Sequence, residues 1–485
     1  MKSRATHVPC PLRTAAIASP GAPAVVGAGG TLTHGELDLR VAMAAEGIEE
    51  LGFGTGARVA LHLPEDERYF VLLLALIRAG CIACPLSTRL PPRGVAPLLQ
   101  KIACRALITS DQELLGATYA GVQKLRTEAL LADEPAARDR ARSSEPLHLA
   151  LDVPATIVFT SGSTGEPKAA LHTFGNHYYS ALGSNSNVAF AQGDRWLHSL
   201  PLYHVGGLSI LFRCLLAGAT VVLPEPGTAL GKAIAGGATH VSLVPTQLLR
   251  LLRQEDFERG ALKAILLGGG PIPPLLVDEA ASRGLAIHTS YGLTEMASQV
   301  TATPPGAPRE VLRTSGRLLP HREISTSDDG EILVRGETLF AGYVKNDIVD
   351  RPLDMEGWFH TKDLGELDAD GYLSVRGRQD NLFISGGENV QPEEIEEALC
   401  HLEGVEEAVV VPISEAEFGS RPVAFVRTVE GAARLGDLAR ALELHLPRFK
   451  IPVAFHGWPE GVGEMKVDRV FFRDRARRLH HEGRG

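Results

Sequence analysis

Several features that define whole classes of protein are missing from this chain of 485 residues. Its six cysteines are too few for the disulfide framework that stabilises small secreted domains. Its longest apolar run, Tyr69 to Ile77, has nine residues, well short of the roughly 20 needed to cross a bilayer. No apolar signal core follows Met1, and no internal repeat or low-complexity block is visible. We therefore expect a soluble, cytoplasmic protein without stable membrane insertion.

An excess of basic residues is missing as well. Lys and Arg number 48 against 58 Asp and Glu, a formal net charge of −10, which argues against a nucleic-acid partner. Cys81 and Cys84 form a CxxC pair in an apolar stretch without a second pair, which favours buried thiols over metal binding or redox chemistry. At about 150 residues per domain, the length predicts roughly three domain-sized units.

Short apolar runs alternate with helical patterns through the first two thirds of the chain, which predicts α/β architecture with parallel sheets covered by helices. Thr33 and Glu36 form a capping box that begins one such helix, and Gly52 ends it. The apolar face of this helix is expected at Leu37, Val41, Ala44, Ile48 and Leu51. The expected strands cover residues 106–109, 155–159, 220–223, 240–244 and 264–267.

The pattern changes after about residue 316. Residues 331–336 and 371–376 alternate apolar with polar side chains and are bounded by turn signals, which predicts an antiparallel β subdomain. A smaller α+β pattern follows. We expect a large domain over residues 1–377, a hinge at residues 378–381, and a small mobile α+β domain over residues 382–485.

The strongest chemical signal is the segment 160–170, which follows an expected strand. Its glycines let backbone N–H groups point at phosphate oxygens, its hydroxyls donate hydrogen bonds, and its lysine supplies positive charge. It is not a Walker A loop, because Lys168 lies three residues beyond Gly165. The alternative is a flexible surface loop. The candidate phosphate-binding residues are Thr160, Ser161, Gly162, Ser163, Thr164, Gly165 and Lys168.

This segment resembles the phosphate-binding signature of the adenylate-forming superfamily of acyl-CoA synthetases, adenylation domains and luciferases. Four further motifs resemble the superfamily's and occur in its order, at residues 291–295, 361–365, 377–381 and 463–469. The resemblance covers about residues 25–475. It implies an enzyme that joins an acid to ATP as an acyl-adenylate and then transfers the acyl group to a thiol.

The resemblance also implies roles for individual residues in nucleotide binding. Glu295, helped by Thr164, would hold Mg²⁺, while Asp363 and Arg378 would bind the ribose. Lys466 would be the catalytic cation, although Met465 stands where the superfamily usually has glycine. The adenine slot and its surroundings would comprise Gly268, Gly269, Gly270, Ser290, Tyr291, Gly292 and Thr294. For the glycine triplet a strand-to-helix turn is an equal alternative.

Other segments resemble the subfamily that joins o-succinylbenzoate to coenzyme A in menaquinone biosynthesis. They include residues 172–177, 199–207, 211–213, 243–248, 266–270, 295–298, 380–388, 391–394 and 418–423. This resemblance implies that His204 lies near the reacting carboxylate and that Ser298 lines the acyl pocket. Arg213 would bind the second carboxylate, or else would form a salt bridge with a neighbouring acid. The cofactors implied are ATP and Mg²⁺, with coenzyme A as co-substrate.

In the small domain, Ser385, Gly386 and Gly387 would line the coenzyme A channel, and rotation at Asp380 would exchange this segment with Lys466. The substrates would then be small molecules: an aromatic keto-acid, ATP and coenzyme A. Two alternatives are another aryl- or acyl-CoA ligase of the superfamily and a non-catalytic nucleotide-binding module. The sequence leaves the acid used in the cell, the oligomeric state and the resting domain orientation open.

Overall fold

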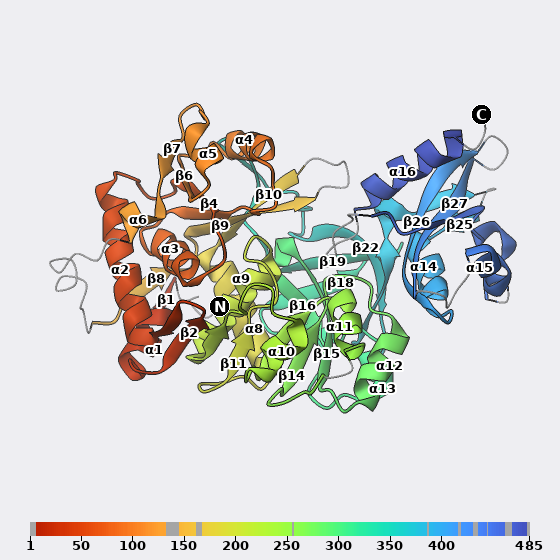
Figure 1. Ribbon diagram of the computed structural model, residues 1–485, viewed down its shortest axis with the longest axis horizontal. Coiled ribbons are helices and arrows are strands. Elements are labelled where there is room, and N and C mark those ends of the chain that lie inside the picture. Colours follow the sequence, from red (N-terminus) through yellow and green to blue (C-terminus); the bar gives the residue numbers. More distant parts are fainter. Residues whose placement is uncertain are drawn as a thin grey trace.

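The computed structural model describes residues 6–131, 145–161, 167–254, 257–385, 388–415, 419–429, 435–443, 445–460 and 468–482. Figure 1 shows a large N-terminal body of mixed helices and strands and a small C-terminal body, in blue, at one end of it. The expected α/β fold class is confirmed. Within the described ranges, no helix is both long and apolar enough to span a bilayer.

One large sheet has the strand order β21-β20-β10-β9-β5-β4-β6-β7. Its centre is parallel, as predicted, but β9 pairs in parallel only with β5 and is antiparallel to β10. The strands are β4 (Arg58–His62), β5 (Ile82–Pro85), β6 (Ala106–Thr109), β7 (Gln123–Leu125), β9 (Pro154–Ser161), β10 (Pro167–Thr173), β20 (Gly342–Lys345) and β21 (Ile348–Asp350).

A second large sheet has the order β17-β16-β15-β14-β13-β11-β12-β2-β3, with a parallel centre and antiparallel edges. The strands are β2 (Pro23–Gly27), β3 (Gly30–Thr33), β11 (Arg195–Leu197), β12 (Thr220–Val222), β13 (His240–Leu243), β14 (Ala264–Leu267), β15 (Ile287–Leu293), β16 (Ser298–Ala302) and β17 (Arg317–Leu318). The predicted strands of this region are all present.

Two smaller sheets follow. The predicted antiparallel subdomain is formed by β18 (Arg322–Thr326), β19 (Glu331–Gly336), β22 (Phe359–Leu367) and β23 (Leu373–Arg378). The small C-terminal body is built on β24 (Phe383–Ser385), β25 (Glu388–Val390), β26 (Val405–Glu415), β27 (Gly419–Thr428) and β28 (Ala454–Gly457). A short ribbon near the N-terminus pairs β1 (His7–Pro9) with β8 (His148–Ala150).

Helices cover the sheets on both faces (Figure 1). In the large body they are α1 (Pro11–Ala18), α2 (His34–Glu50), α3 (Glu67–Arg78), α4 (Pro92–Lys101), α5 (Gln112–Gly116), α6 (Thr127–Leu130), α8 (Phe174–Asn187), α9 (Val205–Ala217), α10 (Leu230–Ala235), α11 (Pro245–Leu252), α12 (Pro274–Ser282), α13 (Arg309–Leu312) and the 3₁₀ turn η1 (Thr294–Met296). From residue 379 onward they are η2 (Gln379–Asn381), α14 (Pro392–Cys400), α15 (Leu435–Leu442), η3 (Arg448–Lys450) and α16 (Arg469–Glu482).

Local signals explain two of these helices. The capping box of α2 is present: Thr33 accepts from the N–H of Glu36 at 3.2 Å, and Glu36 accepts from the N–H of Thr33 at 2.9 Å. The expectation for Leu51 is wrong, because it caps the end of α2 and is 40% exposed. The long apolar run forms α3, whose nine residues from Tyr69 to Ile77 are all buried. A helix that is apolar all round belongs to the core.

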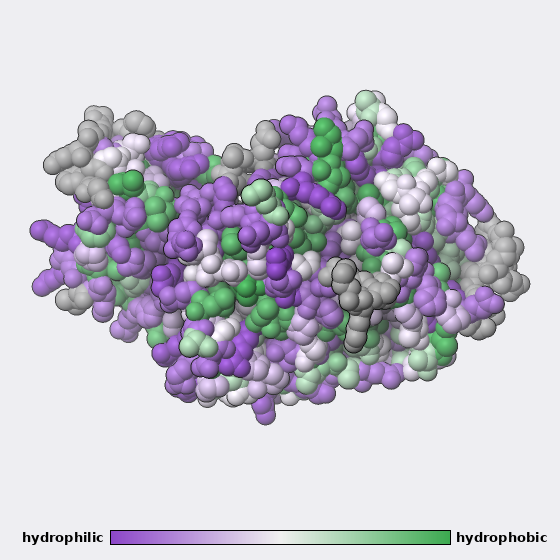
Figure 2. Space-filling view, turned by 180° about the vertical axis from the view of Figure 1, so that it is seen from behind, coloured by the Kyte–Doolittle hydropathy of each residue, from purple (hydrophilic) through white to green (hydrophobic). Residues whose placement is uncertain are grey.

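The outer surface is largely polar. Figure 2 shows hydrophilic residues over most of the face turned away from the view of Figure 1, with hydrophobic residues in small separate groups. Single exposed apolar side chains are ordinary on globular proteins.

Candidate active site

The phosphate-binding candidate joins two antiparallel strands. Thr160 lies at the end of β9 and Lys168 at the start of β10, and the two residues face each other in register. Gly162, Ser163, Thr164 and Gly165 lie outside the described residues, as does the side chain of Ser161. Because the described residues that follow the loop form the strand β10, they provide no helix N-terminus for an anion. The exposed ammonium of Lys168 therefore supplies the positive charge among the described residues of this segment.

Glu295 is held by a segment that the sequence analysis did not select. Tyr343 on β20 donates its hydroxyl to Oε1 of Glu295 at 2.5 Å, and the N–H of Phe340 donates to the carbonyl of Glu295 at 2.8 Å. Burial and the Glu295 carboxylate raise the pKa of the Tyr343 phenol well above its usual value. Lys168 Nζ lies 4.9 Å from the centre of the Tyr343 ring, within cation–π range.

The surroundings of Glu295 suit Mg²⁺ bound partly by a substrate. Across the described ranges, no cluster of three or more His, Cys, Asp or Glu side chains could hold a metal ion by itself. Mg²⁺ is commonly held by one or two carboxylates together with substrate phosphates and water. Glu295, with Oε1 engaged by a phenol and Oε2 available, fits that role beside Lys168. Thr164, the expected helper, lies outside the described residues.

The predicted adenine slot is built from close backbone contacts. A Cβ on Gly268 would lie 2.6 Å from Oγ of Ser290, and one on Gly292 would lie 2.2 Å from the carbonyl oxygen of Ser298. Any larger side chain would therefore push these segments apart. Of the two interpretations of the glycine triplet, a turn is present, since β14 ends at Leu267 and α12 begins at Pro274. The same turn packs against Ser290.

Asp363 is oriented by two donors. The hydroxyl of Tyr291 donates to one carboxylate oxygen at 2.7 Å, and Arg378 Nη1 donates to the other at 2.9 Å. Burial and the Asp363 charge raise the pKa of Tyr291 well above its usual value, so the phenol remains a donor. An ionised carboxylate has about four lone-pair sites and is the kind of acceptor that ribose hydroxyls require.

The candidate hinge residue is linked to this carboxylate. Asp380 in η2 lies 3.2 Å from Lys362 Nζ and 3.5 Å from Arg378 Nη2. Lys362 has a left-handed backbone, with φ of 61°, an uncommon conformation for a residue with a Cβ. Arg378 thus contacts both the ribose candidate and the hinge candidate.

Unusual backbone conformations also follow Glu295. Ala297 and Ser298 have φ of 52° and 128°, although neither is glycine. Such conformations cost about 1–3 kcal/mol each and concentrate at functional sites. Ser298 donates from its hydroxyl to Ser209 of α9 at 3.4 Å, and Thr294 accepts from His172 Nε2 at 2.7 Å. The turn that carries Glu295 is thus fixed on both sides.

Arg213 on α9 is a buried charge, only 1% exposed. Its Nη2 donates to Oε1 of Gln299 at 2.9 Å, and its guanidinium lies 5.0 Å from the ring of Trp196. Burial lowers its pKa to about 10. Of the two interpretations of Arg213, a salt bridge to an acid is not seen: no carboxylate pairs with it in the described part of the chain. Its Nε and the Nε2 of Gln299 are buried donors without a partner in those ranges.

A second buried cation, Arg322, also contacts Gln299. Arg322 donates from Nε to the carbonyl of Gln299 at 2.6 Å and from Nη2 to the carbonyl of Ser180 at 3.0 Å. Burial and the nearby charge of Arg213 lower the pKa of Arg322 to about 9. Neither Arg322 nor Gln299 was selected from the sequence, because neither belongs to a recognisable motif. Together these groups form a donor-rich, positively charged interior that suits an anion.

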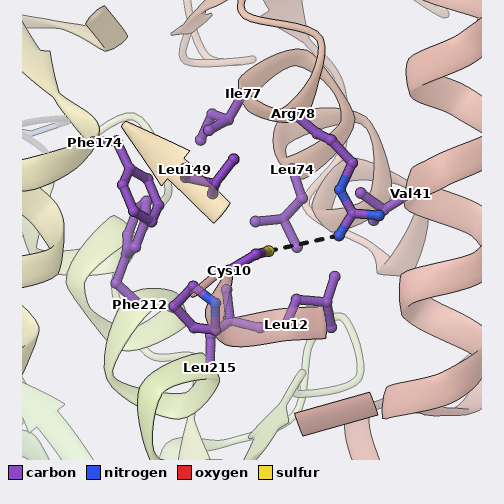
Figure 3. Close-up of a pocket in the computed structure, with 11 residues that line it drawn as sticks. Cys10, Leu12, Val41, Leu74, Ile77, Arg78, Leu149, Phe174, Phe212 and Leu215 are labelled. Atoms are coloured by element: carbon purple, nitrogen blue, oxygen red, sulfur yellow. Dashed lines mark hydrogen bonds between the residues drawn. The ribbon is translucent and has the colours of Figure 1, made fainter. Parts of the chain in front are cut away.

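Helix α9 is packed from its other side by apolar residues. Figure 3 shows Phe212 and Leu215 directed at Cys10, Leu12 and Leu74 around a small pocket. The thiol of Cys10 accepts from Arg78 at 3.8 Å. This packing fixes the rotation of α9 about its axis, so that Ser209 and Arg213, one turn apart, face β16.

His204 precedes α9 as its N-cap residue and is half-buried, with its ring 4.7 Å from that of Tyr203.

The buried-thiol interpretation of the CxxC pair is confirmed, since Cys81 and Cys84 are both free and buried. Burial raises the pKa of Cys81 to about 11, which makes it a poor nucleophile or metal ligand.

Three candidates of the small body, Lys466, Gly386 and Gly387, lie outside the described residues. Ser385 ends β24 and is buried. Arg469, three residues after Lys466, is anchored to α14, where it pairs with Glu396 at 2.6 Å and Glu393 at 3.1 Å. Arg469 therefore ties the first residue of α16 to α14.

Comparisons with known proteins agree with this geometry. Residues 12–344 match the model of the AMP-binding enzyme family, and residues 394–460 match that of the AMP-binding enzyme C-terminal domain. The chain is 37% identical to the 2-succinylbenzoate–CoA ligase of Salmonella typhimurium over 89% of this chain and 90% of that protein.

Two solved structures from Bacillus subtilis are similar throughout. The o-succinylbenzoate CoA synthetase in complex with its acyl-adenylate intermediate superposes with a TM-score of 0.86 at 30% identity, covering 97% of this chain and 99% of that one. The same enzyme in complex with ATP and a magnesium ion superposes with a TM-score of 0.83 at 30% identity, covering 93% and 96%.

Proposed function

The chain belongs to the AMP-binding enzyme family, and we propose that it ligates 2-succinylbenzoate to coenzyme A through an acyl-adenylate. The observation that carries the choice of acid is Arg213, a fully buried guanidinium with no carboxylate partner among the described residues. An unpaired buried charge is costly unless a ligand neutralises it. 2-Succinylbenzoate has a second carboxylate, on its ring, that can do so while the succinyl carboxylate reacts. Ser298 and His204 would line the same acyl pocket.

In the first half-reaction a carboxylate oxygen of the acid attacks the α-phosphorus of ATP. The bond from that phosphorus to the bridging oxygen breaks, and pyrophosphate leaves with the electron pair. Negative charge gathers at the phosphoryl group, so catalysis depends on positioned positive charge. Residues 160–165 and Lys168 would hold the phosphates, Glu295 and Thr164 would hold Mg²⁺, and Lys466 would contact the reacting oxygens. Mg²⁺, when bound, would neutralise phosphate charge there.

A separate group of residues would hold the nucleoside part of ATP. Asp363, oriented by Tyr291 and Arg378, would accept hydrogen bonds from the ribose hydroxyls. The adenine base would lie between the Gly268–Gly270 turn and the Ser290–Gly292 segment, with Thr294 beyond it. The close approach of Gly268 and Gly292 to neighbouring backbone supports this placement.

In the second half-reaction the thiol sulfur of coenzyme A attacks the acyl carbon, AMP leaves, and the thiol proton is released. We assign this step to a different orientation of a small domain, residues 382–485, about a hinge at residues 378–381. Ser385, Gly386 and Gly387 would then approach the pantetheine arm in place of Lys466. The ion pairs of Asp380 with Lys362 and Arg378 support a hinge whose orientation is held electrostatically.

The partners of this activity are small molecules: the acid, ATP and coenzyme A. We assign the enzyme to the cytoplasm because its substrates are cytosolic metabolites and its six cysteines are all free thiols.

A substrate panel tests the proposal. Thioester formation is measured with 2-succinylbenzoate, with 4-oxo-4-phenylbutanoate, which lacks the ring carboxylate, and with benzoate and fatty acids. We expect 2-succinylbenzoate to be used best and Arg213→Met to abolish its advantage over the analogue without the ring carboxylate. If benzoate or fatty acids are converted to thioesters and 2-succinylbenzoate is not, the protein is another acyl-CoA ligase. If ATP binds but none of the acids is converted, the protein is a non-catalytic nucleotide-binding module.

A further inference from the structure

Tyr343 contacts two oppositely charged side chains of the candidate site at once. Its hydroxyl donates to Glu295 at 2.5 Å, while Lys168 Nζ lies 4.9 Å from the centre of its ring. The partially positive hydroxyl hydrogen meets the carboxylate, and the electron-rich ring face meets the ammonium. One tyrosine therefore contacts the carboxylate through its hydroxyl and the ammonium through its ring.

The register of the sheet explains why these groups meet. Tyr343 on β20 lies opposite Ala170 on β10, and Lys168 is two residues before Ala170 on the same strand. Residues two apart on a strand share a face, so Lys168 is a diagonal neighbour of Tyr343. The N–H of Phe340, three residues before Tyr343, holds the carbonyl of Glu295 at 2.8 Å.

Tyr343 is itself held firmly. Its ring packs edge-on against Phe340 with 4.8 Å between ring centres. Gly342 beside it has φ of 142°, and a Cβ there would lie 2.4 Å from the carbonyl oxygen of Asp350. Only glycine permits β20 to approach β21 this closely, so the position of the tyrosine is fixed by the backbone around it.

We propose that Tyr343 is a positioning residue that keeps the Lys168 ammonium and the Glu295 carboxylate from pairing with each other and aims both at the magnesium nucleotide. A lysine and a glutamate within reach of one tyrosine would otherwise form an ion pair. That pair would consume the charge meant for the phosphates and the oxygen meant for Mg²⁺. This inference rests on the proposed function, in which Lys168 and Glu295 have those roles.

The test measures binding and not turnover. ATP binding to the full-length protein is measured by titration calorimetry without acid, at a series of Mg²⁺ concentrations and in EDTA. Tyr343→Phe keeps the ring between the charges but loses the hydrogen bond to a charged acceptor, so we expect half-saturating Mg²⁺ to rise about tenfold with ATP affinity in EDTA unchanged. Tyr343→Leu removes the ring as well, so we expect ATP affinity in EDTA to fall several-fold too.

The matched control is Tyr372→Phe, which removes a hydroxyl from another ring that lies under a cation, Arg317 at 4.2 Å. We expect this variant to bind Mg²⁺ and ATP like the unmodified protein, and thermal unfolding shows that each variant is folded. An unchanged Mg²⁺ dependence in Tyr343→Phe would overturn the inference. Equal ATP affinity in EDTA for the Leu and Phe variants would overturn the separation of charges. If the unmodified protein shows no Mg²⁺-dependent ATP binding, the proposed function itself fails.

Discussion

Tyr291 and Asp363 are joined by a hydrogen bond in which the phenol hydroxyl donates to the carboxylate at 2.7 Å. The two residues belong to strands of different sheets, β15 and β22, so this bond ties the segment proposed to bind the base to the residue proposed to bind the ribose. Arg378 holds the second carboxylate oxygen and continues to Asp380. The proposed ribose-binding residue and the candidate hinge are thus connected through Arg378.

Tyr291→Phe tests the orienting role of this bond. The variant keeps the aromatic ring but removes one of the hydrogen bonds that orient Asp363, so we expect the KM for ATP to rise about tenfold. The KM for the acid should not change, because the acyl pocket is bounded by other residues. Steady-state kinetics with each substrate varied in turn would show the difference, and an unchanged KM for ATP would mean that Arg378 alone orients the carboxylate.

Arg213→Met should leave the folded protein as stable or more stable while it weakens binding of the acid. Methionine fills a similar volume without a desolvated charge, and replacing a buried charge in this way is commonly neutral or stabilising, here by about 1–3 kcal/mol of unfolding free energy. We expect the KM for 2-succinylbenzoate to rise steeply in the same variant. Denaturant unfolding and kinetics measure the two effects. Arg213→Lys, which keeps the charge, is the control and should retain more of the affinity for the acid.

Ala297→Gly tests the strained backbone after Glu295. Glycine adopts φ near 52° without steric cost, and we expect the unfolding free energy to stay the same or rise by up to about 1 kcal/mol. The control is Ala42→Gly inside α2, where the same exchange should cost about 1 kcal/mol. A loss at Ala297 as large as at Ala42 would show that the left-handed conformation carries no strain.

Buried histidines make stability depend on pH. Burial lowers the pKa of His172 and of His240 to about 4, so each stays neutral in the folded protein, while the unfolded chain binds a proton below about 6.5. The contribution of the two neutral histidines to the free energy of unfolding is therefore full above pH 6.5 and is lost as the pH falls toward 4. When the pH falls from 7.5 to 5.5, each of the two histidines should lower the free energy of unfolding by about 1.4 kcal/mol.

Urea unfolding at several pH values measures this slope. His240→Gln should remove one histidine's share of it between pH 7.5 and 5.5, whatever the variant does to stability at neutral pH. The same slope with and without His240 would contradict a depressed pKa at that position.

The sequence predicted those parts of the site that are local. A glycine-rich loop after a strand, and a carboxylate at a fixed place in a short motif, are recognisable without knowledge of what they contact. Asp363 and Glu295 were selected in this way, and the alternating patterns predicted β19 and β23 on either side of the strand that carries Asp363. Lys466 stays a prediction, since it lies outside the described residues.

Tyr343 could not be selected, for a physical reason. Its contacts with Lys168 and Glu295 depend on β20 pairing with β10 across more than 160 residues of chain, and nothing in the local pattern specifies that register. The left-handed Ala297 was hidden as well, because no glycine marks the position. Gln299 and Arg322 became meaningful only when both were seen to meet Arg213.

The most direct measurement of the central claim is the exchange of labelled pyrophosphate into ATP by the purified protein, with Mg²⁺ and without coenzyme A. We predict exchange that requires 2-succinylbenzoate and is reduced about 10²–10³-fold in Lys466→Ala, which should still form thioester from supplied acyl-adenylate. If 2-succinylbenzoate elicits no exchange while coenzyme A thioesters still form, the acid is not activated through an adenylate and the account is contradicted.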